Sequence, residues 1–310
     1  MEAARRPRIV VVGSYAVGLV MRTASVPLRG ETVLGHDFQR MDGGKGSNQA
    51  IACARLGAHT TFLAAIGDDP TGDAAIALLQ GEGVDTSYVH RVAGTPTGVG
   101  FIIVDDAGEN AIAVDLGANR LLAPEHIDRA EEAIARADLL LAQLEIPPAT
   151  ALYAMRTARR YGVRTILNPA PAQPLPKEGL AAVDLLTPNL AEARTLTGAA
   201  SADPEELASI LRRFGAGTVV LTLGEHGARI SGEHETRAVP ARPVQAVDTT
   251  GAGDAFNAAL AVALAEGASV QSAVVYACAA GAYCVQSLGT VPSYADRAHL
   301  AAFLASAANG

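Results

Sequence analysis

The chain has no tryptophan, and aromatic residues make up only 4% of its 310 residues. Small aliphatic side chains must therefore fill the interior, because hydrophobic residues still amount to 49% of the chain and exclude wholesale disorder. No run of about 18 apolar residues predicts a membrane span. The N-terminus also lacks the apolar stretch and cleavage site of a signal peptide. We expect a soluble, cytoplasmic protein.

Cysteine and positive charge are also scarce. The three cysteines, Cys53, Cys278 and Cys284, form no CxxC pair, and no HExxH motif occurs, which argues against a structural zinc site. Such a sparse, odd count fits a reducing compartment. The 24 Lys and Arg residues are outnumbered by 32 Asp and Glu, for a net charge of −8. Nucleic acid and anionic membranes are therefore not expected partners, and any bound phosphate must be held by local geometry.

Short β-branched runs alternate with Ala/Leu-rich stretches along most of the chain. This alternation predicts an α/β fold with a mostly parallel sheet covered by helices on both faces. The expected strands are 8–12, 61–65, 138–142, 163–167, 183–186 and 218–223. The expected helices are 47–56, 71–82, 124–136, 148–161, 189–197, 203–214, 253–266 and 269–287.

Two stretches break this rhythm. Residues 15–42 contain extended segments and turns, and residues 96–117 alternate like a hairpin. Both predict a small β-sheet outside the main one. Because no low-complexity linker divides the chain, we interpret residues 1–310 as a single domain with a β-lid formed by 15–42 and 96–117.

The strongest local motif is Val247-Asp-Thr-Thr-Gly-Ala-Gly-Asp-Ala-Phe256, which leads into a predicted helix. Backbone N–H groups at such a turn, together with the helix dipole, form an anion hole for a phosphoryl group. Asp254 in the first helical turn can accept a proton from a substrate hydroxyl. The simpler alternative is an aspartate that caps a helix after a glycine-rich turn.

A second motif, Gly43-Gly-Lys-Gly-Ser-Asn48, also leads into a helix. It is not a Walker A loop, because Gly46 follows Lys45 and the first glycine has the wrong offset. Its glycines allow a ligand to approach the backbone, and Lys45 and Asn48 offer hydrogen-bond donors. The alternative is a flexible helix entry without a binding role.

Together, these two motifs resemble the signatures of the ribokinase-like (PfkB) carbohydrate kinase family, closest to its ribokinase branch. The resemblance extends over about residues 8–300, and further segments match it in order: Gly67-Asp68-Asp69, Thr97-Gly-Val99, Gln143-Leu-Glu145, Asn168-Pro-Ala-Pro171, Asn189-Leu-Ala-Glu192 and Thr222-Leu-Gly224. It implies a three-layer sandwich with a mostly parallel central sheet and a small β-lid. It also implies ATP-dependent phosphorylation of a primary hydroxyl on a small sugar, ribose or a related pentose or ketose.

The resemblance also assigns roles on the acceptor side of the site. Asp254 matches the general base, and the anion hole falls on Gly251, Ala252 and Gly253. Electrostatic stabilisation by such a hole is a large catalytic contribution. The residues expected to contact the sugar are Gly44, Lys45, Asn48, Glu145 and Asp254.

On the nucleotide side, the resemblance implies ATP, Mg²⁺ and an activating K⁺. Asn189 and Glu192 match the pair that orients the phosphates and magnesium-bound water, and the adenine is expected near 278–289. The full set of expected nucleotide residues is Asn189, Glu192, Thr222, Gly224 and Gly253. The expected ligands of the monovalent cation are Asp248, Thr250, Gly289 and Ser293.

In the ribokinase branch, lids of two subunits often pair. We therefore expect a homodimer through the β-lid, since an exposed sheet otherwise leaves unpaired edges and an apolar face. Phe38, Phe101 and Ile103 are candidate interface residues, with simple packing inside the lid as the alternative.

One departure limits the assignment of the sugar. Where the family carries Asn and a sugar-binding Asp, this chain has Ala16 and Gly18. Either the pocket accepts a larger, deoxygenated or differently substituted substrate, or Tyr15, Arg22 or Asp42 compensates. An inward-pointing Arg22 would favour an anionic substituent; otherwise it is a solvated lid residue.

Three rival functions stay open at this point. A nucleoside kinase of the same family would need a base-sized apolar pocket near Gly18. A catalytically idle sugar-binding protein is disfavoured by the intact Lys45, Asp254 and glycines. A Rossmann dehydrogenase would rest on Gly13 and Gly18 alone, without the G-x-G-x-x-G spacing.

Overall fold

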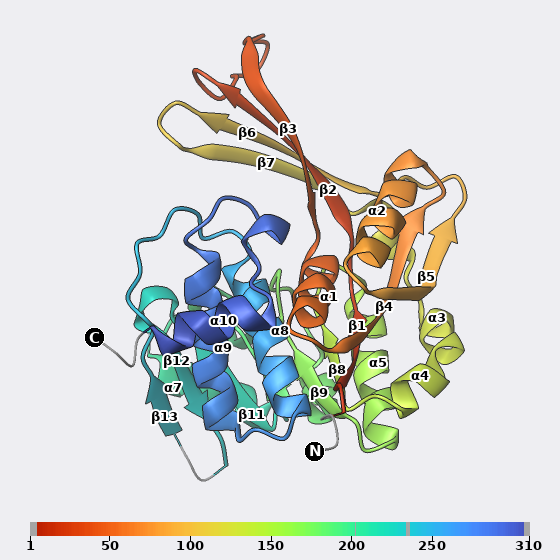
Figure 1. Cartoon of the computed structure of the whole chain (residues 1–310), viewed down its shortest axis with the longest axis vertical. Helices are drawn as coiled ribbons and strands as arrows, with labels where there is room; N and C mark the ends of the chain where they lie inside the picture. The colour runs from red at the N-terminus through yellow and green to blue at the C-terminus, as the bar shows by residue number, and fades with distance from the viewer. Residues whose placement is uncertain (1–4, 202, 234–235, 307–310) are drawn as a thin grey trace.

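A computed structural model describes residues 5–201, 203–233 and 236–306 (Figure 1). Within these ranges the central sheet has nine strands in the order β13-β12-β11-β10-β9-β8-β1-β4-β5. Neighbouring strands from β5 to β11 are parallel, and an antiparallel hairpin of β12 and β13 adds one edge. The strands are β1 (Arg8–Val12), β4 (His59–Gly67), β5 (Asp85–Val92), β8 (Leu139–Ala142), β9 (Arg164–Leu167), β10 (Leu185–Leu186), β11 (Thr218–Thr222), β12 (Ala228–Ser231) and β13 (Thr236–Val239).

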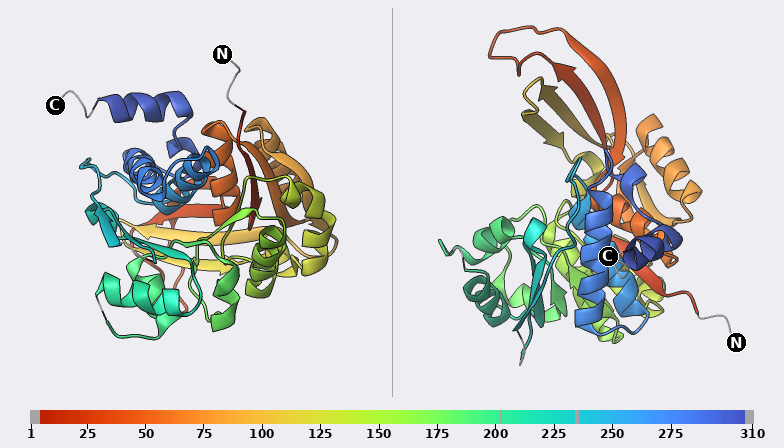
Figure 2. Two further views of the ribbon diagram at one scale, coloured as in Figure 1. Left: turned by 90° about the horizontal axis from the view of Figure 1, so that it is seen from below. Right: turned by 60° about the vertical axis from the view of Figure 1, so that its left-hand side comes forward.

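Helices cover both faces of this sheet (Figure 2). In β1, Ile9 and Val11 pack with one helical layer, whereas Val10 and Val12 pack with the other, because side chains alternate along a strand. The first layer contains α1 (Lys45–Arg55), α2 (Pro70–Gly81), α8 (Ala252–Ala265), α9 (Val270–Cys284) and α10 (Arg297–Ala305). The second contains α3 (Pro124–Arg129), α4 (Glu131–Ala135), α5 (Pro148–Arg160), α6 (Leu190–Thr197) and α7 (Pro204–Arg213). This three-layer arrangement agrees with the predicted α/β class.

A second sheet of four strands, in the order β3-β2-β6-β7, projects from this body (Figure 1). Its strands are β2 (Ala16–Thr23), β3 (Gly35–Gly43), β6 (Gly98–Asp105) and β7 (Asn110–Asp115). They coincide with the two stretches that the sequence set apart, 15–42 and 96–117, except that β3 extends one residue further. Several large apolar side chains of this sheet are exposed, among them Phe38, Phe101, Ile112 and Val114.

The helix predicted over 124–136 is wrong in one respect. Ala130 has φ −100° and ψ 8°, so the segment forms two short helices, α3 and α4. Neither proline nor glycine marks this break.

The strands β5, β12 and β13 were not predicted. Short 3₁₀ helices are η1 (Gly117–Leu121), η2 (Lys177–Ala182), η3 (Gly224–His226) and η4 (Val291–Ser293). Among the residues that the structure describes, no helix combines the length and apolarity needed to cross a bilayer.

Candidate active site

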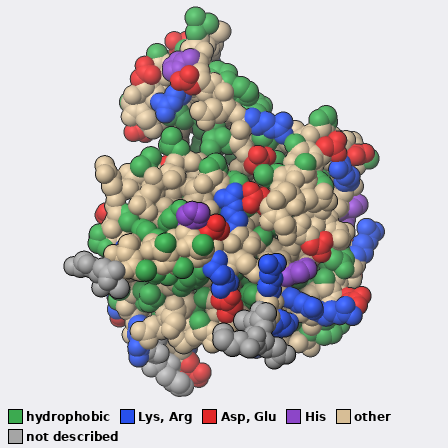
Figure 3. Space-filling view, in the orientation of Figure 1, with side chains coloured by type: hydrophobic (Ala, Val, Ile, Leu, Met, Phe, Trp, Pro, Cys, Tyr) green, Lys and Arg blue, Asp and Glu red, His purple; other side chains and the backbone are tan. Residues whose placement is uncertain are grey.

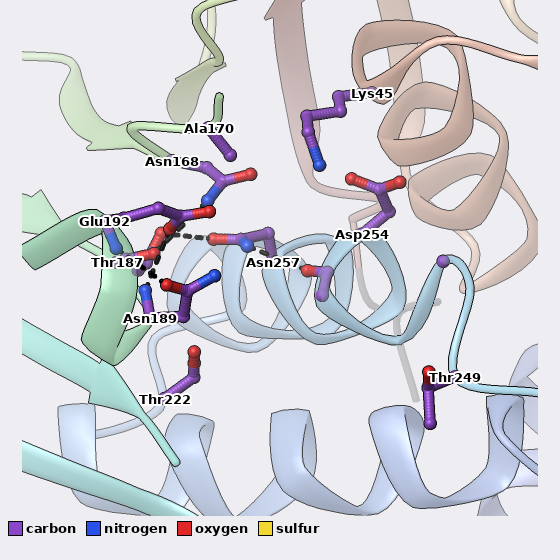
Figure 4. Close-up of a pocket in the computed structure, with 12 residues that line it drawn as sticks. Lys45, Asn168, Ala170, Thr187, Asn189, Glu192, Thr222, Thr249, Asp254 and Asn257 are labelled. Carbon is purple, nitrogen blue, oxygen red and sulfur yellow. Dashed lines mark hydrogen bonds between the residues drawn. The ribbon is translucent and has the colours of Figure 1, made fainter. Parts of the chain in front are cut away.

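A cleft of about 220 Å³ opens at the carboxyl ends of the parallel strands (Figure 4). Asn168 follows β9, Thr187 follows β10, and Thr222 ends β11, which is the edge where open α/β sheets place ligands. The lining residues are Lys45, Asn168, Ala170, Thr187, Asn189, Glu192, Thr222, Thr249, Gly251, Gly253, Asp254 and Asn257. Six residues predicted for the site, Lys45, Asn189, Glu192, Thr222, Gly251 and Gly253, therefore lie on one cleft with Asp254.

The N-terminus of α8 closes one side of this cleft. Gly251 caps the helix with φ 81°, a left-handed conformation that favours glycine. A Cβ at Gly253 would have no neighbour within 4 Å, so this backbone faces open space. The first N–H groups of a helix have no intrahelical partner, and the helix dipole makes this end positive. The predicted anion hole at Gly251, Ala252 and Gly253 therefore has the local geometry to receive a phosphoryl group.

Asp254 lies in the first turn of α8 and is only 5% exposed. Its Oδ2 accepts a hydrogen bond from Asn48 Nδ2, and its Oδ1 accepts one from Gln49 Nε2, each 2.9 Å long. Burial raises the pKa of Asp254, while the ammonium of Lys45 opposes this shift. The Lys45 side chain points toward Asp254 (Figure 4), and this carboxylate is the main cause of the raised pKa of Lys45.

Glu145 holds the start of α1 in place. Its Oε2 accepts hydrogen bonds from Ser14 Oγ at 2.5 Å and from the backbone N–H of Lys45 at 2.8 Å. Gly44 precedes this helix with φ 91°, and a Cβ there would come within 2.8 Å of the backbone of Tyr15 and Ala16. Gly44, Asn48 and Glu145 thus lie beside the cleft, whereas Lys45 lines it.

Asn189 and Glu192 form a reciprocal capping box at the start of α6. The Asn189 side chain accepts from the N–H of Glu192, and the Glu192 side chain accepts from the N–H of Asn189, both at 2.8 Å. Burial raises the pKa of Glu192. Thr222 forms an isolated β-bridge with Asn189 and lines the same cleft. Gly224, also predicted for the nucleotide side, lies two residues further on and does not line it.

The four residues predicted for a monovalent cation lie in one cluster beside α8. Asp248 accepts hydrogen bonds from the N–H groups of Thr250 and Gly289, both at 2.9 Å. Although burial opposes it, these donors lower the pKa of Asp248. The Cys284 thiol lies 3.0 Å from Ser293 Oγ and donates weakly to the Thr250 carbonyl at 3.7 Å, so it joins Ser293 to the same loop.

Several buried polar residues at the site were not assigned a role from the sequence. Asn168, Thr187 and Asn257 line the cleft, while Gln49 and Gln143 lie fully buried behind it. Asn168 belongs to the quoted Asn-Pro-Ala-Pro segment, and Gln49 directly follows Asn48, so both were signalled only by their neighbours. The contact between α1, α8 and the strand ends brings these polar groups together.

The face of the four-stranded sheet around Gly18, in the β-lid expected from the sequence, is apolar. Gly18 pairs with Met41 of β3 and with Gly100 of β6. A Cβ at Gly18 would meet the flexible end of Ile102 at 3.2 Å. The terminal methyl of Met41 lies 2.8 Å from the position of a Cβ on Gly289, so this lid face is turned toward the body beside α8.

Tyr15 and Asp42, considered as substitutes for the missing carboxylate, bind each other instead. The Tyr15 hydroxyl donates to Asp42 Oδ1 at 2.5 Å, and the tyrosine is fully buried. Because Asp42 is adjacent to Met41 in β3, its side chain leaves from the face opposite to Gly18. Arg22 is exposed near the outer end of β2. The Gly18 face therefore keeps its apolar character.

Asp254 is a carboxylate beside a glycine-rich helix N-terminus at the edge of a parallel sheet. This arrangement is typical of a phosphotransferase with an alcohol acceptor. Comparison with known proteins specifies the class. The pfkB family carbohydrate kinases match residues 6–297, and the chain belongs to this family.

The relatives cover nearly the whole chain. A ribokinase of Haemophilus influenzae is 38% identical over 96% of this chain and 99% of its own length. A deoxyribokinase of Salmonella typhimurium is 36% identical over 92% of this chain and 95% of its own. The solved structure of Arabidopsis thaliana ribokinase with ribose and ATP has a TM-score of 0.90 at 32% identity and covers 97% of this chain and 99% of its own. The predicted family, fold class and enzyme class are confirmed.

Proposed function

We propose that the protein transfers the γ-phosphoryl group of ATP to a primary hydroxyl of a small sugar, ribose or a related pentose or ketose, with Asp254 as general base. The observation that carries this proposal is the placement of Asp254, buried one residue after the Gly251–Gly253 turn and faced by Lys45 (Figure 4). The similarity to a ribokinase bound to ribose and ATP supports the choice of sugar and nucleotide.

In the proposed step, the sugar hydroxyl lies against Asp254, which takes its proton as the oxygen attacks the γ-phosphorus. The new O–P bond forms while the bond to ADP breaks. The N–H groups at Gly251, Ala252 and Gly253 stabilise the charge on the moving phosphoryl oxygens, and the α8 dipole adds to them. The raised pKa of Asp254 matches a group that must accept a proton.

The remaining sugar hydroxyls are assigned to the start of α1. Asn48 Oδ1 is buried without a hydrogen-bond partner among the described residues, so it is available to accept from a hydroxyl. Lys45 donates from the cleft wall. Gly44 allows the backbone to approach the sugar. Glu145, which accepts from Ser14 Oγ, is the last residue assigned to contact the sugar.

The nucleotide phosphates are assigned to the opposite wall, to Asn189, Glu192 and Gly253, with Thr222 and Gly224 toward the base and the adenine near 278–289. The carboxylate and amide oxygens of Glu192 and Asn189 are the donor type that Mg²⁺ prefers, and their small number suits an ion that keeps waters and phosphate oxygens. When bound, Mg²⁺ neutralises phosphate charge.

A K⁺ ion is assigned to the cluster of Asp248, Thr250, Gly289 and Ser293. Asp248 supplies a negative charge and accepts from two backbone N–H groups, and Ser293 Oγ, which donates to the Thr290 carbonyl, supplies a neutral oxygen. The remaining ligands are assigned to backbone carbonyls of Thr250 and Gly289. Because this loop leads directly into Gly251, the ion would stabilise the conformation of the anion hole. We expect turnover to fall when K⁺ is replaced by a bulky organic cation.

The acceptor is expected to present an apolar edge to the lid. Gly18, Gly100 and Ile102 offer no side-chain hydrogen-bond donor or acceptor. A site is selective through its paired polar groups, so a deoxygenated carbon loses nothing on this face. 2-Deoxyribose is therefore expected to compete with ribose.

We also assign the four-stranded sheet to a lid that excludes water, within a single domain spanning 1–310, and its apolar surface to a homodimer contact. Phe38 and Phe101 are 61% and 56% exposed, and hydrophobic side chains follow the projecting sheet (Figure 3). Apolar surface of this kind on a projecting sheet suits a second copy of the same sheet.

An ADP-release assay with Mg²⁺, with and without K⁺, tests the proposal across ribose, 2-deoxyribose, fructose, other pentoses and several nucleosides. The phosphorylated carbon is read by ³¹P–¹H NMR. Selective turnover of a pentose or ketose at its primary hydroxyl is expected. Preference for a nucleoside would contradict the proposal and indicate a nucleoside kinase. Sugar binding without turnover would contradict it and indicate a catalytically idle sugar-binding protein.

A further inference from the structure

Behind the catalytic cleft, three amide side chains form a buried chain: Gln143, Gln49 and Asn168. Gln143 Nε2 donates to Gln49 Oε1 at 2.5 Å. Gln49 Nε2 in turn donates to Asn168 Oδ1 at 3.1 Å and to Asp254 Oδ1 at 2.9 Å. We call these three residues the buried amide chain.

Chemistry allows Gln49 only one orientation. An ionised carboxylate can only accept hydrogen bonds, so the Nε2 group must face Asp254. The amide oxygen then faces Gln143, which supplies the donor that it needs. A rotated Gln49 would set its amide oxygen against the oxygens of Asp254 and Asn168 and lose both of these hydrogen bonds. The side chain of Gln143 packs closely against Gly13: a Cβ on Gly13 would lie 2.2 Å from Gln143 Oε1.

The chain continues through the strand ends to the anion hole. Asn168 Nδ2 donates to the Thr187 carbonyl at 3.2 Å, and Thr187 Oγ1 donates to Asn257 Oδ1 at 2.6 Å. Asn257 Nδ2 donates to the Gly253 carbonyl at 2.8 Å. Since Gly253 precedes Asp254, this path connects both sides of the first turn of α8.

Gln49 differs from Asn48, the other donor to Asp254. Asn48 has a free oxygen and belongs with the acceptor contacts. Gln49 is 0% exposed, does not line the cleft, and uses both N–H groups and its oxygen inside the protein. It can therefore affect the reaction only through Asp254 and Asn168.

We propose that Gln49 is a positioning residue that fixes Asp254 in one rotamer and in its ionised form. This inference rests on the proposed role of Asp254 as general base. Hydrogen bonds to a charged group are stronger than neutral ones, so loss of Gln49, which donates to Asp254, should affect the carboxylate more than loss of Gln143, which donates only to Gln49.

The test compares Gln49→Met with Gln143→Met, two variants that each remove one buried amide of the same type. For both, kcat and KM for ribose are measured across pH, and folding is checked by thermal unfolding. Gln49→Met is expected to lower kcat roughly 10- to 100-fold, with KM nearly unchanged. The acidic side of the kcat–pH profile, here called the acid limb, moves to higher pH in Gln49→Met, because the lost Gln49 donor had favoured the charged form of Asp254. Gln143→Met loses comparable stability but keeps its acid limb near that of the unchanged protein.

Gln49→Glu supplies a second measurement that preserves the shape of the side chain. Two carboxyl groups in hydrogen-bond contact share one proton, so the base is protonated at neutral pH and activity recovers as the pH rises. A pH profile identical to that of the unchanged protein, or equal acid limbs in Gln49→Met and Gln143→Met, would overturn the proposal. If Asp254→Asn kept normal turnover, the assignment of Asp254 as base would itself fail. If Asp254→Asn is inactive but the pH profiles of the Gln49 variants are not shifted, only the proposed role of Gln49 is rejected.

Discussion

The cleft floor and the lid are built on opposite physical principles. On the floor of the cleft, Asp254 is buried, and Asn48 and Gln49 beside and behind it hold it with hydrogen bonds that leave little freedom. In the lid, Phe38 and Phe101 are exposed on a thin sheet that projects from the body (Figure 1). A buried polar group costs free energy when its partner is lost, whereas an exposed apolar one does not. The floor is therefore suited to fixed chemistry, and the lid to specificity and association.

Removal of the floor carboxylate should have the largest effect. Asp254→Asn retains the shape but cannot accept the hydroxyl proton, so kcat should fall by about 10²–10⁴. Asp203→Asn makes the same change at the N-terminus of α7, away from the cleft, and should keep full activity. Steady-state ADP release by both variants checks this. Near-normal turnover of Asp254→Asn contradicts the base assignment.

The next largest effect is expected from the anion-hole turn. Gly251→Ala forces a Cβ at φ 81° and within 2.8 Å of the Tyr294 hydroxyl, and a displaced turn should cost roughly 10²-fold in kcat. The Tyr294 hydroxyl is buried without a hydrogen-bond partner among the described residues. Tyr294→Phe should therefore not lower the Tm, and combined with Gly251→Ala it should restore part of the lost activity. No recovery in the double variant would rule out this steric explanation.

In the lid, one residue should alter the choice of sugar. Gly18→Asp places a carboxylate on the apolar face, where only the flexible end of Ile102 lies within 3.4 Å of the new Cβ. A hydrogen bond to a charged group should raise the kcat/KM ratio of ribose over 2-deoxyribose roughly 10-fold. Gly81→Asp, at a site with no neighbour within 4 Å, serves as the control. An unchanged ratio would show that Gly18 does not face the acceptor.

The floor should also impose a pH dependence. Burial raises the pKa of Asp254 above its ordinary value of 3.8, although Lys45, Gln49 and Asn48 oppose the shift. Because the base must be ionised, kcat should fall as the pH drops through this raised pKa, above the range of a free aspartate. Measurement of kcat at saturating ATP and sugar tests this. An acid limb at the free-aspartate value would be inconsistent with it.

The smallest effect on catalysis is expected from the lid surface. Phe101→Asp places a charge on exposed apolar surface and should convert a dimer into monomers, with a modest change in kcat. Val275→Asp changes a 47% exposed apolar residue on α9, outside the lid, and should leave the dimer intact. Sedimentation velocity measures both. A dimer that survives Phe101→Asp, or a monomeric unchanged protein, contradicts the lid contact.

The sequence predicted the residues that line the cleft better than the buried residues that hold them in place. Lys45 and Asp254 were assigned from two glycine-rich motifs, and the structure brings them to one cleft. Gln143 lies in a segment that matches the family and Gln49 follows Asn48, but neither received a role, because a buried amide is defined by partners that are 205 and 94 residues away in the chain. The break at Ala130 and the hairpin β12–β13 were also not predicted, since local propensity does not mark them.

The amino-acid sequence by itself determined the α/β alternation, the family and the residues to which we assign the chemistry, because glycine turns and helix starts are local features. The tertiary structure alone decided how these residues are held. It joined Tyr15 to Asp42, turned Gly18 toward an apolar lid face and set Gln49 between Asp254 and Asn168. Such contacts depend on packing between α1, α8 and the strand ends, which no single segment specifies.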